Sequence, residues 1–263
     1  MDMSARIQEA LATIAQEEQV RIIYACESGS RAWGIASQNS DYDVRFLYVR
    51  PQNDYLRLDM PRDVIELPIV DDLDINGWDI FKALRLLRNS NPPLLEWLFS
   101  PIVYQESSIY VEALRDIARR LYSQTSIFYH YSNMAYRNYH AYIEQKDSVS
   151  LKKYLYVLRP IIALLYLQQH SKLAPTSFIQ TMAAVQFPQE VRVRIEQLLV
   201  LKQAGEEMGM GDADPMLNAF IVEHLDRWRD PSFKQQQPKS SWKELDGLLL
   251  SILNEAREVT AER

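Results

Sequence analysis

The feature that most constrains this sequence is a loop between two strand-like segments. Residues 20–25 (VRIIYA) and 42–49 (YDVRFLYV) are short runs rich in β-branched and aromatic side chains, a composition that favours strands. The loop between them carries Gly29, Ser30 and Asp41, and Asp43 is the second residue of the second segment. The sequence therefore predicts a strand, a loop with a Gly-Ser pair at its start, and a second strand that opens on an acidic pair.

The acidic pair has the chemistry of a metal site. Asp41 and Asp43 are two residues apart, so they project from the same face of a strand. Two neighbouring carboxylates repel each other unless a cation lies between them, and Mg²⁺ prefers oxygen ligands of this kind. Gly29 lets the backbone approach an anion, the Ser30 hydroxyl can bond phosphate oxygens, and Arg31 can add a charge-assisted contact. Together these residues predict a site for a nucleoside triphosphate and its metal.

A simpler interpretation of the acidic pair remains open. The chain contains three Asp-x-Asp pairs, and the other two are Asp72/Asp74 and Asp212/Asp214. The last of these lies in the turn-like string GMGDADP, which favours helix capping and solvation. Gly-Ser is also an ordinary turn dipeptide, so a solvated strand end is the alternative. The metal site is favoured by the combination of strand, Gly-Ser, spaced loop and acidic strand start.

The pattern along the chain changes from mixed to helical. Ser4 is a plausible N-cap for a first helix, and residues 64–70 and 73–75 are further strand-like segments, with Pro68 indicating an edge or a break. Helical patterns follow at residues 78–87, 94–99, 109–121, 127–145, 151–170, 188–208, 215–229 and 242–258, with a polar linker at 231–241. We therefore predict an α+β fold in which a catalytic domain (1–110) precedes a mainly helical domain (111–263).

Composition excludes several classes of protein. Cys26 is the only cysteine, so neither an internal disulfide nor a cysteine-type zinc site can form. The net charge of −6 argues against broad binding to duplex DNA, which needs a basic surface. The N-terminal residues have no secretory pattern and no apolar stretch is long enough for a membrane span, so we expect a cytoplasmic protein. No Gly-x-Gly-x-x-Gly or Walker-type string indicates a different nucleotide fold.

The combined strings resemble a known family. GSRAWGIASQNSDYDVRF, followed by DINGWDIFKALRLL and SNPPLLEWLFSP, resembles the DNA polymerase β-like nucleotidyltransferase superfamily. Within it, the strings are similar to the predicted nucleotidyltransferases associated with RNA repair, the RlaP or YcgL-like family. The resemblance covers residues 20–105 and continues more loosely through KKYLYVLRPIIALLYL.

The resemblance implies both a fold and a site. The fold is a mixed sheet backed by helices, on which three carboxylates hold two divalent ions, Mg²⁺ or Mn²⁺. Asp41 and Asp43 match the first two carboxylates, and Gly29 with Ser30 matches the phosphate-holding turn. The third carboxylate should lie on a later strand, and Asp74 is our choice, with Asp72 on the same face as the alternative. Asp74 would also accept the proton of the attacking hydroxyl, and Asp79 is expected to cap the next helix.

The implied function is transfer of a nucleoside monophosphate from an NTP to an acceptor hydroxyl, with release of pyrophosphate. An RNA end, a protein and a small molecule are the candidate acceptors. Lys152 and Arg159 would contact the triphosphate, because helical domains of such enzymes commonly complete the nucleotide site; a solvated basic face is the alternative. The aromatic helix at 127–145 could stack RNA bases or simply pack against other helices. A nucleotide-binding regulatory module, such as an antitoxin, is the competing function.

Overall fold

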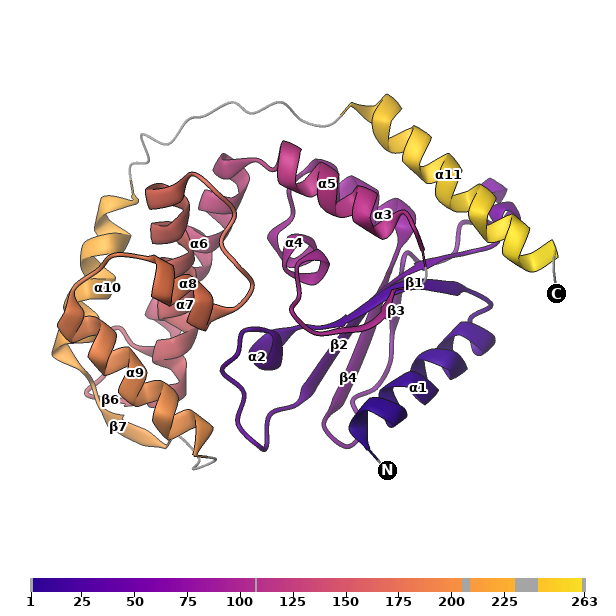
Figure 1. Cartoon of the computed structure of the whole chain (residues 1–263). Coiled ribbons are helices and arrows are strands. Elements are labelled where there is room, and N and C mark those ends of the chain that lie inside the picture. Colours follow the sequence, from indigo (N-terminus) through magenta and orange to yellow (C-terminus); the bar gives the residue numbers. More distant parts are fainter. Residues whose placement is uncertain (1, 107, 205–208, 230–240, 262–263) are drawn as a thin grey trace. The chain divides into compact units, whose positions relative to one another are not determined.

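The computed structural model describes residues 2–106, 108–204, 209–229 and 241–261. The chain forms two compact units that interleave along the sequence (Figure 1). The first unit contains the described residues of 1–32, 41–122 and 238–263, and the second those of 33–40 and 123–237. Residues 33–40 of the predicted loop thus belong to the second unit, and the C-terminal helix belongs to the first. The domain division predicted at residue 110 stays a prediction.

The first unit is an α+β structure, as predicted. Its elements are α1 (Met3–Glu17), β1 (Arg21–Glu27), α2 (Gly29–Ala32), β2 (Tyr42–Val49), η1 (Gln52–Leu56), β3 (Val64–Glu66), β4 (Leu73–Asp79), α3 (Ile80–Arg88), α4 (Pro92–Leu98), β5 (Val103–Glu106), α5 (Val111–Leu121) and α11 (Trp242–Ala261). The strands form one mixed sheet in the order β3-β4-β2-β1-β5. Only β2 and β4 pair in parallel; the other neighbours are antiparallel.

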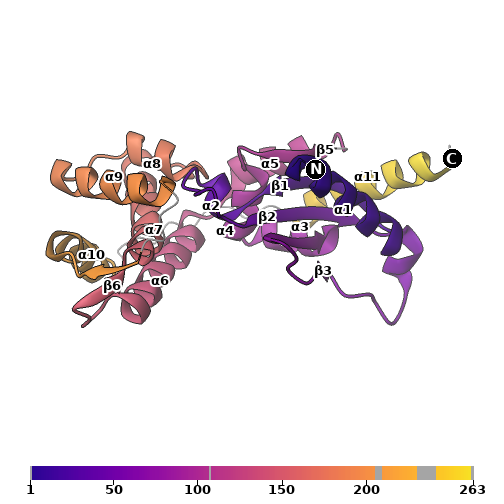
Figure 2. The same cartoon turned by 90° about the horizontal axis from the view of Figure 1, so that it is seen from below.

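Helices cover both faces of this sheet. Ile7, Leu11 and Ile14 recur three and four residues apart on α1, and they are buried in one core with Val44 and Phe46 of β2. Because side chains alternate along a strand, the residues between these core positions of β2 face the opposite side, where α3 and α4 lie (Figures 1 and 2). The sheet is therefore a middle layer, and each face of β2 has a different environment.

Several predicted boundaries in the first unit were wrong. The first helix begins at Met3 after Asp2, before the predicted cap Ser4, and the strand predicted at 64–70 ends at Glu66. The strand predicted at 73–75 runs to Asp79, and the helix predicted from residue 78 begins at Ile80. Strand pairing explains the longer β4, since Gly77 and Trp78 lie between partners on β2 and β3. The apolar pattern of residues 78–87 concealed this pairing.

The second unit is mainly helical, as predicted. Its elements are α6 (Gln124–Tyr142), β6 (Ser148–Ser150), α7 (Leu151–His170), α8 (Phe178–Ala184), α9 (Gln189–Gln203), β7 (Met210–Asp212) and α10 (Pro215–Arg227). The short pair β6-β7 and the helix α8 were not predicted. Asp214 caps α10 by accepting from the amides of Met216 and Leu217, as its turn-like context indicated. The linker predicted at 231–241 lies almost entirely outside the described residues.

No helix in the described part of the chain is both long and apolar enough to cross a membrane.

Candidate metal and nucleotide site

The parallel pairing of β2 with β4 places two carboxylates side by side. Asp43 of β2 lies directly opposite Asp74 of β4 in the register of the two strands. Both side chains are on the face away from α1, because Tyr42, Val44 and Phe46 occupy the α1 face. The side chains of Asp43 and Asp74 are 28% and 21% exposed, so both remain accessible to solvent. Two of the three predicted metal-binding acids are therefore neighbours.

A cation of the chain itself lies between these two carboxylates. Arg45 is two residues after Asp43 on the same face of β2, and its Nη2 donates to Asp43 Oδ1 at 3.1 Å and to Asp74 Oδ2 at 2.7 Å. Its Nη1 donates to the Asp74 carbonyl oxygen at 2.9 Å. The amide of Asn76 donates to the remaining oxygen, Asp74 Oδ1, at 2.6 Å. The acidic pair is thus compensated by an arginine that the sequence interpretation passed over.

The surroundings of Asp43 shift the pKa of its carboxyl upward. Burial raises the pKa of the Asp43 carboxyl, the positive charge of Arg45 opposes the rise, and the negative charges of Asp74 and Asp41 add to it. A carboxylate in this position is destabilised by its surroundings and stabilised by positive charge. Positive charge close to the two acids therefore favours the ionised form of Asp43.

The Gly29 turn lies directly against the Asp43 carboxylate. The amide of Ser28 donates to the Asp43 carbonyl oxygen at 2.8 Å, which brings the end of β1 against the start of β2. Gly29 has a positive φ of +58°, and a Cβ built on it would lie 1.9 Å from Asp43 Oδ2. Glycine is needed here for space as well as for backbone conformation. The short helix α2, with Ser30 and Arg31, follows this turn.

Glu27 supports Asp43 from the opposite face of the sheet and was not predicted from the sequence. It is fully buried, and its Oε1 accepts from the backbone amide of Asp43 at 2.7 Å while Tyr104 donates to Oε2. Burial raises the pKa of Glu27, and the hydrogen bond from Tyr104 opposes that rise. The available signal was an acid placed directly at the end of an apolar strand, where a charged group needs partners.

Asp41 and Asp72 do not join the pair in this structure. Asp41 is exposed and precedes β2, and its carbonyl oxygen accepts from Arg31 Nε at 3.2 Å while the Arg31 guanidinium lies 3.6 Å from the Tyr42 ring centre. Asp72 is exposed in the turn before β4, with a φ of +64°. The described residues contain no group of three or more His, Cys, Asp or Glu side chains arranged to hold a metal ion. The geometry thus distinguishes Asp74, which faces Asp43, from Asp72, which does not.

Lys152 and Arg159 lie on α7 in the second unit. Lys152 is exposed, with its Nζ 6.0 Å from the centre of the Tyr156 ring. Arg159 is buried, and its guanidinium lies 3.9 Å from the ring centre of Trp33, a loop residue that belongs to the same unit. Their contact with a triphosphate stays a prediction.

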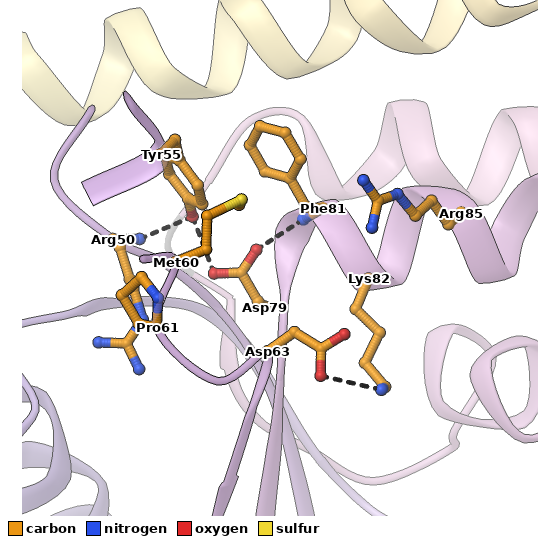
Figure 3. Close-up of a pocket in the computed structure, with 9 residues that line it drawn as sticks. All are labelled: Arg50, Tyr55, Met60, Pro61, Asp63, Asp79, Phe81, Lys82 and Arg85. Atoms are coloured by element: carbon orange, nitrogen blue, oxygen red, sulfur yellow. Dashed lines mark hydrogen bonds and ion pairs between the residues drawn. The ribbon is translucent and has the colours of Figure 1, made fainter. Parts of the chain in front are cut away.

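A separate pocket lies at the other end of β4 (Figure 3). Asp79 is buried there and caps α3, as expected, by accepting from the Phe81 amide at 2.8 Å. Tyr55 of η1 donates to the other carboxylate oxygen at 2.9 Å, and its ring stacks on Phe81. Asp79 lies five residues beyond Asp74 on β4, so its role in fixing the start of α3 is separate from the acidic pair.

We expect Asp79 to make stability depend on pH. Burial raises its pKa from 3.8 to about 6, so between these values the folded chain holds a proton that the unfolded chain has lost. The stability that protonated Asp79 contributes to the fold is therefore full below about pH 4 and is lost as pH rises through 6. Relative to Asp79→Asn, which retains a capping oxygen, the free energy of unfolding of the wild type should fall by roughly 1–3 kcal/mol between pH 4 and pH 7. Denaturant unfolding measures this difference, with the exposed Asp59→Asn as control; parallel pH profiles for wild type and Asp79→Asn would contradict it.

Comparison with known proteins identifies relatives along nearly the whole chain. The family model described as "RlaP: RNA repair pathway DNA polymerase beta family" matches residues 3–251. The uncharacterized protein YcgL of Bacillus subtilis (strain 168) is 42% identical over 254 residues, which cover 96% of this chain and 97% of that protein. A crystal structure of a nucleotidyltransferase-like protein from Exiguobacterium sibiricum aligns with 98% of this chain and 80% of its own, at 14% identity and a TM-score of 0.31.

Proposed function

This chain belongs to the RNA repair pathway DNA polymerase beta family, and from that membership we propose that it is a metal-dependent nucleotidyltransferase. The family indicates a polymerase β-type enzyme, a class that generally uses divalent metals with an NTP. The proposed reaction moves a nucleoside monophosphate from the NTP to an acceptor hydroxyl and releases pyrophosphate. An RNA end is the acceptor that the family description favours.

The observation that carries the proposal is the pairing of Asp43 with Asp74 across β2 and β4, with the Arg45 guanidinium between them. Two carboxylates on adjacent strands, both partly exposed, offer the oxygen ligands that Mg²⁺ and Mn²⁺ prefer. Arg45 occupies the place where positive charge is needed and so acts as a substitute for a metal ion. The residues present therefore fit a divalent cation.

Each residue then has a defined role in the proposed reaction. Asp43 and Asp74 would hold the ion, and Asp41 would join them from the start of the same strand. The turn at Gly29 and Ser30 would bind phosphate oxygens through its amides and the Ser30 hydroxyl, and Arg31 would add positive charge. Asp74 would accept the proton from the attacking hydroxyl. A bound divalent ion supplies charge that stabilises the pyrophosphate leaving group and activates the acceptor.

Glu27 is a positioning residue in this scheme. Glu27 accepts hydrogen bonds from the Asp43 amide and from the Tyr104 hydroxyl. These bonds fix the backbone of β2 at Asp43, beside the turn that follows β1. Because Glu27 is on the α1 side of the sheet, opposite Val44, it contacts Asp43 through the backbone and leaves the carboxylate on the other face, where it pairs with Arg45. The site is thus supported from behind by a buried hydrogen-bonded pair.

We expect Arg45 to compete with the metal ion for the two carboxylates. Arg45→Met should bind Mn²⁺ about tenfold more tightly than the wild type, because the ion no longer displaces the guanidinium. Without metal, the same variant should be less stable by about 1–2 kcal/mol, because Asp43 and Asp74 are left uncompensated. Calorimetric titration with Mn²⁺ and denaturant unfolding measure the two effects. Arg62→Met, which removes an exposed arginine of the first unit, is the control, and equal Mn²⁺ affinities in both variants would refute the competition.

Incubation with each of the four α-labelled NTPs and Mg²⁺, with and without RNA, tests the proposed reaction. Label on RNA supports an RNA end as acceptor, and label on protein supports a protein acceptor. Nucleotide binding without any transfer, over a panel of RNA, protein and small-molecule acceptors, would instead favour a regulatory nucleotide-binding module.

A further inference from the structure

A lysine takes an apolar position in the second unit. The buried residues of α9 recur at helical spacing, as Val191, Ile195, Leu198 and Leu199, and Lys202 continues the same buried stripe one turn later. Lys202 is only 4% exposed. Long cationic side chains at such positions normally extend to bring the ammonium into water. The Lys202 ammonium is instead buried with the rest of the side chain.

The Lys202 ammonium lacks a protein partner among the described residues. Its Nζ is buried and donates no hydrogen bond to any residue in that part of the chain. Burial and, to a smaller extent, the positive charge of Lys152 together lower the pKa of Lys202 from 10.5 to about 8. An unpaired buried charge destabilises the folded state, and a like charge beside it adds to that effect. Among the described residues, nothing therefore offsets the charge that Lys202 places in the apolar stripe of α9.

Other lysines converge on the same place. The Nζ atoms of Lys152 and Lys202 each lie 6.0 Å from the centre of the Tyr156 ring, and Lys153 Nζ lies 5.2 Å from it. We call Lys152, Lys153 and Lys202 the lysine cluster. The tyrosine ring offers each ammonium weak cation–π attraction, but it carries no charge to balance three cations. The cluster thus has a net positive charge around one aromatic side chain.

The lysine cluster also adjoins a helix N-terminus. Lys152 and Lys153 lie in the first turn of α7, which contains no acidic residue, and the N-cap Ser150 makes no side-chain capping bond. Cations are disfavoured at this end of a helix, because its free amides already carry partial positive charge. Amides and ammonium groups together attract anions, as helix N-termini do in phosphate-binding sites. Two independent features, the buried Lys202 and the lysine-bearing helix start, therefore both favour an anionic ligand.

We propose that the lysine cluster is a binding site for a phosphate-bearing anion, in which Lys202 and Lys152 contact phosphate oxygens beside Tyr156. The triphosphate of a nucleotide and the phosphodiesters of single-stranded RNA share this chemistry. The site is built from residues of the second unit alone, so it binds without a divalent ion and without Asp43. Its ligand would balance the charge that the described residues leave unbalanced.

Calorimetric titration in EDTA tests this site separately from the metal site. The probes are inorganic tripolyphosphate and a 5′-hydroxyl single-stranded RNA oligonucleotide, each added to the full-length chain. We expect Lys202→Met and Lys152→Met each to weaken binding by about ten- to a hundredfold, the loss expected for a charged hydrogen bond. Lys172→Met, at an exposed position of the second unit, should bind as the wild type does. Asp43→Asn should also bind as the wild type, whatever its activity.

The results separate the possible sources of the phosphate. If the lysine variants bind only tripolyphosphate more weakly, the ligand is of the nucleotide type. If they bind only RNA more weakly, the ligand is a phosphodiester. Without ligand, Lys202→Met should melt at a higher temperature than the wild type, because the unpaired buried charge is gone. Lys152→Met changes an exposed side chain, so it keeps the test decisive if Lys202→Met does not fold. Wild-type protein that binds neither probe, or variants of the cluster that bind as tightly as Lys172→Met, would overturn the proposal.

Discussion

Asp43→Asn is expected to reduce transfer of the nucleoside monophosphate by about a thousandfold or more while leaving the fold intact. The substitution removes one of the two carboxylates that face each other across β2 and β4, and so removes charge that would hold the catalytic cation. Losing several kcal/mol of transition-state stabilisation corresponds to this reduction in rate. The fold should survive, because asparagine keeps an oxygen for Arg45 and relieves the repulsion from Asp74. The measurement is the rate of label transfer from an NTP, together with the melting temperature.

Asp212→Asn provides the matched control for this prediction. It makes the same chemical change in another Asp-x-Asp pair, at an exposed position of β7 in the second unit. Its transfer rate should equal that of the wild type. Substantial activity remaining in pure, folded Asp43→Asn would show that the acidic pair of β2 is not the catalytic centre.

Gly29→Ala is expected to cause the second largest effect, a loss of about a hundredfold in transfer rate. A Cβ at residue 29 would meet Asp43 Oδ2 at 1.9 Å, so either the turn or the carboxylate must move. A displacement of about 1 Å at a catalytic group is enough to reduce a rate a hundredfold. The strained backbone at a φ of +58° should also lower the free energy of unfolding by about 1–3 kcal/mol. Kinetics and denaturant unfolding measure the two effects separately.

Gly34→Ala separates backbone strain from displacement of Asp43. Gly34 has a φ of +74°, but the nearest atoms to a Cβ there are 3.5 Å away, on Ile179 and Ser177. We expect this variant to lose stability comparably and to retain most of its transfer activity. If both glycine variants lost activity equally, strain in the loop rather than contact with Asp43 would explain the effect.

The strand-loop-strand and its Asp43 could be predicted because their signals are local. Apolar runs, a Gly-Ser pair and an acidic strand start are all visible within about 30 residues. The choice of Asp74 over Asp72 required information that is not local, because it depends on which residue lies opposite Asp43 in the strand pairing. That register is set by the parallel pairing of two strands separated by β3 in sequence, and strand periodicity alone does not determine it.

Other features were missed for different physical reasons. Arg45 shares a face with Asp43 by simple alternation, so its position was readable, but its bond to Asp74 depends again on the register. Glu27 became interpretable only when its partners Tyr104 and the Asp43 amide were known, since both are distant in sequence. The assignment of α11 to the first unit depends on contacts such as that of Arg21 with Glu255, which no local pattern indicates.

Binding of Mn²⁺ to the wild type and to the Asp43→Asn, Asp74→Asn and Asp72→Asn variants, in the presence of a non-hydrolysable NTP analogue, tests the central claim most directly. The wild type and Asp72→Asn should bind the ion with equal affinity, because Asp72 lies in the turn before β4. Asp43→Asn and Asp74→Asn should each bind it at least tenfold more weakly, because each loses a carboxylate of the cross-strand pair. Undiminished Mn²⁺ binding by Asp74→Asn would contradict a metal site shared between β2 and β4.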